Sequence, residues 1–190
     1  MIRDEIRDSI ITEGRKEFLN CGFEKASLKN ICKGANITTG AFYRRFKSKT
    51  DLFETIVSPS VLSVKNLVSS PNDDVPTFIR KVLKGKQDED TLLNFFEHRD
   101  NIILLLNAAE GTKYAEFFHN VAKSMSDVAY KYLSSMEEAH EISEEELHIF
   151  MSSYLQAIFE AVVHAQNKDE YRTYVENLNK FYNWEKILTD

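Results

Sequence analysis

Apolar residues recur every three or four positions along most of the chain, which is the spacing that places them on one face of an α-helix. Only three prolines and six glycines interrupt the 190 residues, and the sequence holds no internal repeat. The helices that this pattern predicts cover residues 3–20, 28–34, 39–47, 48–68, 75–83, 90–99, 102–111, 113–136, 144–167 and 169–188. The fold class that follows is all-α.

Two short helices joined by a tight turn are predicted in the N-terminal part. The Ser27 hydroxyl can cap a helix over residues 28–34, and Asn36 can adopt the left-handed conformation that ends it. Thr38 can cap the helix that follows. Helix, tight turn and helix together form the pattern of a helix-turn-helix.

The second of these helices has two different faces. Phe42 and Phe46 lie four residues apart and share one face, which we expect to be buried. The other face carries Thr39, Gly40, Tyr43, Arg44 and Lys47. A helix of about three turns with an aromatic underside and this polar top suits insertion into the major groove of DNA.

Charge is distributed unevenly along the chain. The net charge is −6, but residues 1–58 hold 11 Lys and Arg against 8 Asp and Glu, a balance of +3, while the remainder holds 13 against 22, a balance of −9. Four cations fall within the six residues from Arg44 to Lys49. Because phosphates repel an acidic surface, the first part is the candidate nucleic-acid contact.

Residues 3–55, under a third of the chain, resemble the DNA-binding domain of TetR-type (TetR/AcrR) helix-turn-helix transcriptional regulators. The residues that carry the resemblance are Phe18, Leu19, Gly22, Phe23, Ser27, Leu28, Ile31, Ala35, Asn36, Ile37, Thr38, Gly40, Ala41, Phe42, Tyr43, Phe46, Ser48, Lys49, Leu52 and Phe53. Gly14 and Asn36 depart from the alanine and the glycine that are usual at their positions. The resemblance implies a homodimer that binds a double-stranded DNA operator and responds to a small-molecule effector.

This resemblance, together with the polar helix face, assigns roles to the candidate DNA-binding residues. Tyr43 and Lys49 are expected to contact phosphates, and Thr39, Gly40 and Arg44 to read bases. The other members of the candidate set are Ser27, Thr38, Ala41, Arg45 and Lys47.

Two domains are expected. A helix-turn-helix domain covers residues 1–47, and an effector-binding and dimerisation domain covers residues 48–190. Ser48 and Asp51 make a capping-box-like start for the helix that links them. Pro59 leaves two alternatives: either the residue before it caps a new helix, or one long helix is kinked there.

The last two predicted helices carry more apolar surface than one stripe of an ordinary surface helix. A helix that is apolar on two sides packs inward on one side and against something else on the other. In TetR-type proteins the last two helices form the dimer interface, so we expect an interface made of Leu147, Met151, Tyr154, Leu155, Ile158, Phe159, Val162, Tyr174, Leu178 and Phe181. The alternative is that both stripes pack inside the core of one chain.

Aromatic and polar residues of the second part form a candidate effector pocket. Its members are Phe95, Phe96, Asn107, Glu110, Tyr114, Phe117, Phe118, His119, Met125, Tyr154 and Gln156. Apolar walls with a few polar groups are typical of small-molecule sites. The existence of a pocket follows from the resemblance, and the alternative for each residue is plain core packing.

Signatures of catalysis and of metal binding are absent from the sequence. Five scattered histidines form no HExxH pair and no His/Cys cluster, and no nucleophile-elbow or glycine-rich phosphate motif occurs. The acidic run Glu144–Glu146 fits a helix N-terminus, where Ser143 and Glu146 can form a capping box. We therefore expect no enzymatic activity, no metal and no cofactor.

Transcription regulation is the expected function, in the form of repression relieved by an effector. The alternative is a helical scaffold that uses the helix-turn-helix fold to bind protein without binding DNA. No apolar run approaches the roughly 18 residues that span a bilayer, and the N-terminus lacks a secretory signal, so we expect a cytoplasmic protein that does not bind membranes. Cys21 and Cys32 are expected to be buried thiols.

Overall fold

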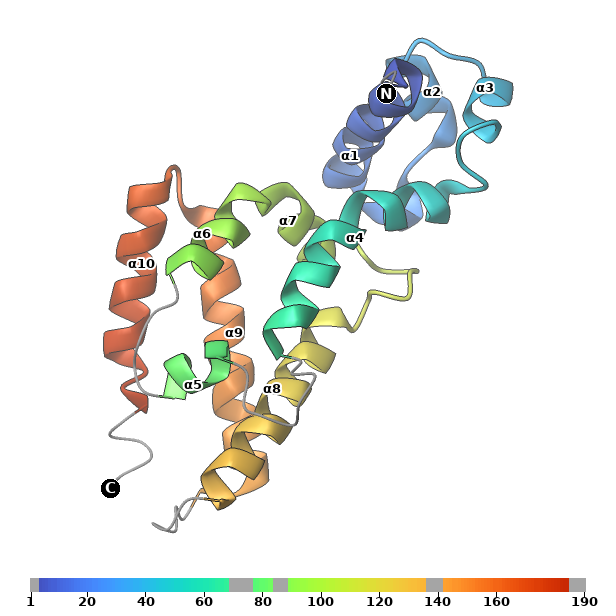
Figure 1. Ribbon diagram of the computed structural model, residues 1–190. Helices are drawn as coiled ribbons and strands as arrows, with labels where there is room; N and C mark the ends of the chain where they lie inside the picture. Colours follow the sequence, from blue (N-terminus) through green and yellow to red (C-terminus); the bar gives the residue numbers. More distant parts are fainter. Residues whose placement is uncertain (1–3, 69–76, 84–88, 136–141, 185–190) are drawn as a thin grey trace. The chain divides into compact units, whose positions relative to one another are not determined.

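The computed structural model describes residues 4–68, 77–83, 89–135 and 142–184, whose regular structure is entirely helical (Figure 1). This confirms the all-α prediction. Its contacts divide the chain into two compact units. The N-terminal unit comprises residues 1–61 and 100–115, and the C-terminal unit comprises residues 62–99 and 116–190. None of the described helices is both long and apolar enough to cross a bilayer.

The N-terminal unit contains the predicted helix-turn-helix. Its elements are α1 (Glu5–Lys25), α2 (Leu28–Gly34), α3 (Thr39–Tyr43) and the first part of α4 (Lys49–Val68). The rings of Phe18, Phe23 and Phe53 contact one another with centroids 5.1–6.0 Å apart and form an aromatic core between α1 and α4. Gly14 allows these two helices to approach closely, because a Cβ atom there would lie 2.6 Å from a methyl carbon of Leu52.

The first helix extends beyond the predicted end at residue 20. Gly22 has a φ of 76°, a left-handed conformation that glycine adopts without strain, and a further turn continues to Lys25. The cap at Ala26 closes this turn through hydrogen bonds from its N–H to the carbonyls of Gly22 and Phe23.

Pro59 lies inside α4, which continues to Val68 as one helix. Proline lacks the N–H that would normally donate to the carbonyl four residues earlier, which here belongs to Thr55. The Ser58 hydroxyl donates to that Thr55 carbonyl at 3.3 Å. Ser58 therefore compensates for the missing donor, and the alternative in which a new helix starts at Pro59 is wrong.

A distant part of the chain completes the N-terminal unit. The helix α7 (Arg99–Asn107) and the residues after it pack there, although they were expected to belong to the second domain. Three contacts attach this segment: the Phe23 N–H donates to the Ala108 carbonyl at 2.9 Å, Asn101 donates to Ser60 at 3.1 Å, and Lys113 pairs with Glu54 at 2.6 Å.

In the C-terminal unit, α8 (Phe117–Ser134), α9 (Glu144–His164) and α10 (Lys168–Phe181) pack side by side, with α5 (Thr77–Leu83) and α6 (Glu89–Glu97) against them (Figure 1). The Ser143 and Glu146 capping box that the sequence predicted begins α9. The helix α8 begins at Phe117, four residues later than predicted. Before it, the Thr112 hydroxyl donates to the Ala109 carbonyl and holds residues 109–114 in a turn. The segment between the predicted helices 48–68 and 75–83 and the end of the last predicted helix, at 185–188, lie outside the described residues.

Truncation of Phe159 tests the core of the C-terminal unit. This side chain is completely buried, and its ring lies 4.2 Å from that of Phe118 and 5.3 Å from that of Phe95. We expect Phe159→Ala to lower the free energy of unfolding by about 3–5 kcal/mol, because it leaves a cavity. Chemical denaturation measures this loss, and Leu62→Ala, at an exposed position of α4, is the control expected to change stability by less than about 0.5 kcal/mol. Equal effects of the two variants would contradict the packing described.

Candidate nucleic-acid interface

The turn between α2 and α3 is fixed by backbone hydrogen bonds. Asn36 takes the left-handed conformation with a φ of 52°, as predicted. Its N–H donates to the Lys33 carbonyl at 3.1 Å, and the Ile37 N–H donates to the Cys32 carbonyl at 2.9 Å. This pair of bonds is the Schellman motif, which satisfies the last carbonyls of α2. The turn therefore sets the direction in which α3 leaves.

Side-chain caps begin both helices. The Ser27 hydroxyl accepts from the Asn30 N–H, and the Thr38 hydroxyl accepts from the Ala41 N–H. Glu17 of α1 accepts from the Ser27 N–H and from the Asn30 side chain, each at 3.0 Å, which ties α2 to α1. Ser27 and Thr38 thus have structural roles as caps, in addition to the DNA contacts expected of them.

Aromatic residues anchor α3 from below. Phe42 and Phe46 are buried with ring centroids 5.7 Å apart, and the guanidinium of Arg7 lies over the Phe46 ring. The helix itself is shorter than predicted: it spans five residues, and a turn closed by hydrogen bonds to the Phe42 carbonyl follows it. The two rings still lie on the same buried side, because the backbone of Arg44 in this turn keeps a right-handed helical conformation.

The opposite side of this region is open to solvent. Thr39, Gly40, Arg44 and Lys47 are exposed, and Tyr43 is 55 % exposed with its ring edge-on to Phe42. Ala41 is half-buried. The structure therefore brings together, on one surface, the residues expected to read bases and the tyrosine expected to contact a phosphate.

Two of the four clustered cations are engaged inside the domain. Arg45 is half-buried, and its Nε donates to both carboxylate oxygens of Asp4 at 3.1 and 3.2 Å. The backbone N–H of Arg7 and the guanidinium of Arg45 hold the pKa of Asp4 below its usual value. This pair joins the start of α1 to the turn after α3.

Lys49 is the second engaged cation. Its ammonium donates to the carbonyls of Phe23, Glu24 and Ala26 at 2.6, 3.0 and 3.1 Å, and it lies 4.6 Å from the centre of the Phe23 ring. A lysine ammonium has three N–H donors, so all of them are used at the end of α1. Of the four cations, Arg44 and Lys47 are the ones left exposed.

The described residues contain no group of three or more His, Cys, Asp and Glu side chains that could hold a metal ion. Cys32 is buried as expected, whereas Cys21 is half-buried, and burial raises the pKa of both thiols.

Comparison with known proteins agrees with this geometry. Residues 10–56 match the model of the bacterial regulatory proteins of the tetR family. An uncharacterized HTH-type transcriptional regulator of Bacillus subtilis, YerO, is 30% identical over 125 residues, which make up 62% of this chain and 42% of YerO. The HTH-type transcriptional regulator SAB2452 of Staphylococcus aureus is 26% identical over 139 residues, or 70% of this chain and 75% of that protein. A TetR-like regulator structure from Rhodococcus sp. RHA1 covers all of both chains with a TM-score of 0.64 and 16% identity.

Residues 10–56 belong to the tetR family of bacterial regulatory proteins. The relatives named above are transcriptional regulators, which agrees with the expectation that the chain is not an enzyme. The match spans less than half the length of YerO, and the structural likeness at 16% identity shows the fold alone.

The predicted dimer interface needs correction on α9. Seven of its residues are buried by the chain's own helices: Leu147, Met151, Tyr154, Leu155, Ile158, Phe159 and Val162. They pack in the core and offer no surface to a partner. The three predicted residues of α10 differ, because Tyr174 and Leu178 are half-buried and Phe181 is 81 % exposed.

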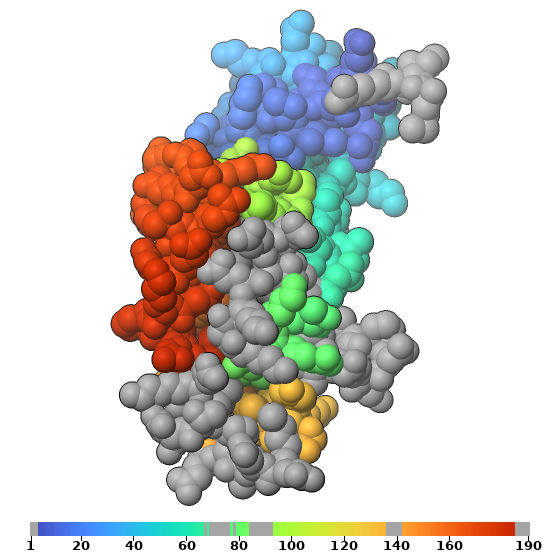
Figure 2. All heavy atoms as spheres, turned by 60° about the vertical axis from the view of Figure 1, so that its left-hand side comes forward, coloured from blue at the N-terminus to red at the C-terminus, as the bar shows by residue number. Residues whose placement is uncertain are grey.

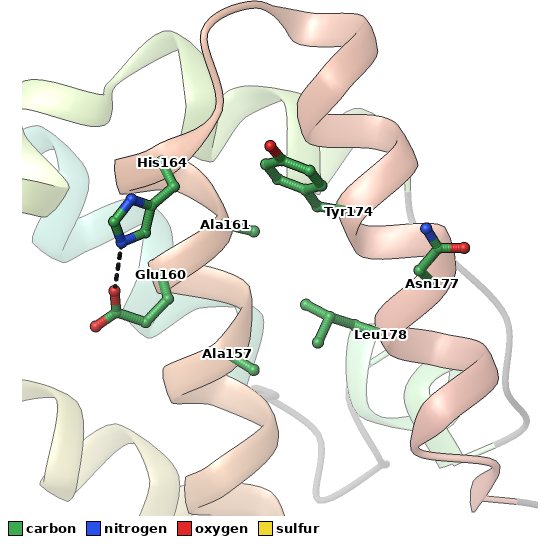
Figure 3. Close-up of a pocket in the computed structure, with 7 residues that line it drawn as sticks. All are labelled: Ala157, Glu160, Ala161, His164, Tyr174, Asn177 and Leu178. Carbon is green, nitrogen blue, oxygen red and sulfur yellow. Dashed lines mark ion pairs between the residues drawn. The ribbon is translucent and has the colours of Figure 1, made fainter.

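An open groove lies between the outer faces of α9 and α10, and Figure 3 shows its lining. Its volume is about 380 Å³, and its lining residues are Ala157, Glu160, Ala161, His164, Tyr174, Asn177 and Leu178. His164 and Glu160 form an ion pair of 3.4 Å at one rim. The α9 residues of this groove were not predicted from sequence, although their spacing of three and four places them on one helix face.

The residues of the predicted effector pocket are divided between the two units. Asn107, Glu110 and Tyr114 belong to the N-terminal unit, and the other eight belong to the C-terminal unit. The polar members expected to orient a guest are mostly exposed: Asn107, Glu110, His119 and Gln156. Phe95, Phe117, Met125 and Tyr154 are buried, and Phe96 and Phe118 are half-buried against other rings.

Replacement of Lys49 tests its structural role. We expect Lys49→Met to lower the free energy of unfolding by about 1–3 kcal/mol, because three carbonyls lose charged hydrogen bonds while the apolar stem is retained. Denaturation of Lys47→Met provides the matched control, since Lys47 is exposed. If Lys49 acted only as a phosphate contact, both variants would be as stable as the original protein.

Proposed function

We propose that the chain is a transcriptional repressor that binds an inverted-repeat operator as a homodimer and is released by a small-molecule effector. The helix-turn-helix of residues 1–47 contacts DNA, and residues 48–190 bind the effector and hold the dimer together. The observation that carries the proposal is the exposed surface of Thr39, Gly40, Tyr43 and Arg44 above the buried Phe42 and Phe46.

The residues of this surface suit different kinds of contact with DNA. Arg44 has a planar guanidinium that can donate two hydrogen bonds to the O6 and N7 atoms of a guanine. Tyr43 and Lys47 can reach phosphates, which fixes the position of the protein but carries no sequence information. Arg45 and Lys49 act indirectly, because their bonds to Asp4 and to the end of α1 hold the surface in place.

Substitution of Arg44 tests base recognition. We expect Arg44→Ala to lose on the order of 1–3 kcal/mol of discrimination at one base pair, because the guanine contact is removed. Selection of bound duplexes from a random pool, followed by titration of matched and mismatched duplexes, measures this. Lys47→Ala is the control, and it should weaken all duplexes alike and reduce the salt slope of binding by about one.

An unchanged base preference in Arg44→Ala, with binding still tight, would show that Arg44 does not read DNA. A chain without salt-sensitive duplex binding would support the alternative of a protein-binding scaffold.

The outer faces of α9 and α10 supply the surface for a second copy of the chain. Tyr174, Leu178 and Phe181 follow one another at helical spacing on α10, beside the small side chains of Ala157 and Ala161 on α9. The outer face of α10 lies at the surface in the space-filling view of Figure 2. Small residues on one helix and large apolar residues on the next allow two copies to interlock in a four-helix arrangement. This contact replaces the one predicted from residues that are buried in the core.

A charge on this surface tests the dimer. We expect Phe181→Glu to weaken self-association by about 2 kcal/mol or more, because an exposed aromatic anchor becomes a desolvated carboxylate. Sedimentation equilibrium measures the association, and circular dichroism confirms that the variant stays folded. Thr173→Glu, which places the same charge on another face of α10, is the control. A variant Phe181→Glu that dimerises like the original protein would exclude this surface.

A further inference from the structure

Two histidines from neighbouring helices of the C-terminal unit lie side by side. His119 belongs to α8 and His148 to α9, and these helices pack against each other (Figure 1). Their imidazole rings are 5.5 Å apart from centre to centre, and the ring planes are inclined by 84°. His119 is exposed and His148 is half-buried, so solvent reaches the pair. The two residues lie far apart in the sequence, which is why no linear ligand motif marks them.

The buried hydroxyl of Ser126 fixes the position of the hydrogen on the His148 ring. A serine hydroxyl has one hydrogen, and Ser126 donates it to the Lys123 carbonyl at 2.9 Å. In the contact of 3.3 Å between the Ser126 oxygen and Nδ1 of His148, the ring N–H is therefore the donor. A neutral imidazole with its hydrogen on Nδ1 keeps a lone pair on the other nitrogen, Nε2. His148 thus presents Nε2 as a ligand.

This arrangement is typical of histidines that bind metals. A metal-ligating histidine binds through one nitrogen while the other donates to a nearby oxygen, which sets the tautomer and the orientation of the ring. Two imidazoles on one ion, at metal–nitrogen distances of about 2.0–2.1 Å and a tetrahedral angle, have ring centres roughly 5 Å apart. The observed separation of 5.5 Å is close to this spacing. The two helices therefore already hold the rings at the separation that a shared ion requires.

The ligand set restricts the kind of ion and the strength of its binding. Imidazole nitrogens favour zinc, nickel and copper over magnesium and calcium, which prefer oxygen ligands. Among the described residues, no third His, Cys, Asp or Glu joins the pair in a larger metal-binding group. A structural zinc site has four protein ligands, whereas water would complete the coordination here. The ion would therefore exchange with solvent.

We propose that His119 and His148 form a site for one exchangeable divalent transition-metal ion, with Ser126 as the residue that positions His148. This differs from the expectation drawn from the sequence, which was that the chain binds no metal. His119 was first expected to line an effector pocket, and only the packing of α8 against α9 places a second ligand beside it. The inference goes beyond the proposed function and does not rest on it.

Binding of Ni²⁺ to the full-length protein tests the site. Nickel chloride is titrated calorimetrically into protein that carries no histidine tag and has been freed of metal with a chelator. We expect one Ni²⁺ to bind per chain, Cu²⁺ to bind more tightly and Mg²⁺ not to bind, because the ligands are imidazoles. His119→Ala should weaken Ni²⁺ binding at least about tenfold, or about 1.4 kcal/mol, since one of two ligands is lost. His98→Ala removes another exposed histidine and is the control, expected to bind Ni²⁺ like the original protein.

Two further variants separate metal binding from folding. His148→Asn keeps an N–H that can donate to Ser126 but has no Nε2, so it should fold normally and weaken Ni²⁺ binding as much as His119→Ala does. Ser126→Ala keeps both ligands but removes the acceptor that orients His148, and it should weaken binding about tenfold. Circular dichroism without metal measures the fold of each variant. Saturating Ni²⁺ should raise the Tm of the original protein and leave that of His119→Ala unchanged, because a ligand stabilises the state that it binds.

Three results would overturn the site. Binding of Ni²⁺ by His119→Ala as tight as by the original protein would show that the two rings do not share an ion. Equal losses in His119→Ala and His98→Ala would show adventitious binding at surface histidines only. No binding of Ni²⁺ to the original protein would exclude the site directly.

Duplex binding, measured on the same protein, separates this proposal from the proposed function. A protein that binds its selected duplex but not Ni²⁺ keeps the proposed function and loses the site. A protein that binds Ni²⁺ through His119 and His148 but binds no duplex keeps the site and loses the regulator.

Discussion

The carboxyl end of α1 is the point on which the N-terminal unit depends. A helix leaves its last carbonyls without partners, and the left-handed Gly22 adds a further break near this end. Lys49 satisfies three of the carbonyls with one ammonium, and the Ala108 carbonyl accepts from the Phe23 N–H. The start of α4 and a segment from much later in the chain are thus fixed to the same few atoms. The direction of α4 relative to α1, and with it the position of α2 and α3, follows from this joint.

Signals that act over three or four residues were predictable from sequence. The caps at Ser27, Thr38 and Ser143 and the left-handed Asn36 lie where the sequence places them, because each depends on one side chain and the adjacent backbone. Lys49 was not predictable in this way. A cation beside a groove-binding helix has the same sequence pattern whether it faces phosphates or the end of another helix, and its partners lie more than 20 residues away.

The partner of the broad apolar surface of α9 was likewise not predictable from sequence. Periodicity shows that Leu155, Ile158 and Phe159 avoid water, but it cannot say whether the covering surface comes from the same chain or from a partner. In the structure α8 and α10 cover them, together with other helices of the unit. The surface proposed for a partner is marked by a different feature, which is small residues on α9 beside the half-buried Tyr174 and the exposed Phe181 on α10. The most apolar positions of the sequence do not reveal this surface, because its alanine and histidine residues add little to the hydrophobicity of α9.

Sequence periodicity also could not show that the predicted pocket residues are divided between the two units. This division of the chain bears on how an effector could influence the DNA-binding part. The chain passes between its two units three times, near Val61, Arg99 and Ala115, so α4 is one of several covalent connections. A guest shifts the DNA-binding part only by the difference in its affinity for two arrangements of the chain. Segment 100–115 ends at Ala115, directly before α8, and its contacts to Phe23 and Glu54 join it to α1 and α4. The segment that joins α8 to the N-terminal unit therefore contacts both α1 and α4, so α4 is one of two routes by which the chain connects these helices covalently to the C-terminal unit.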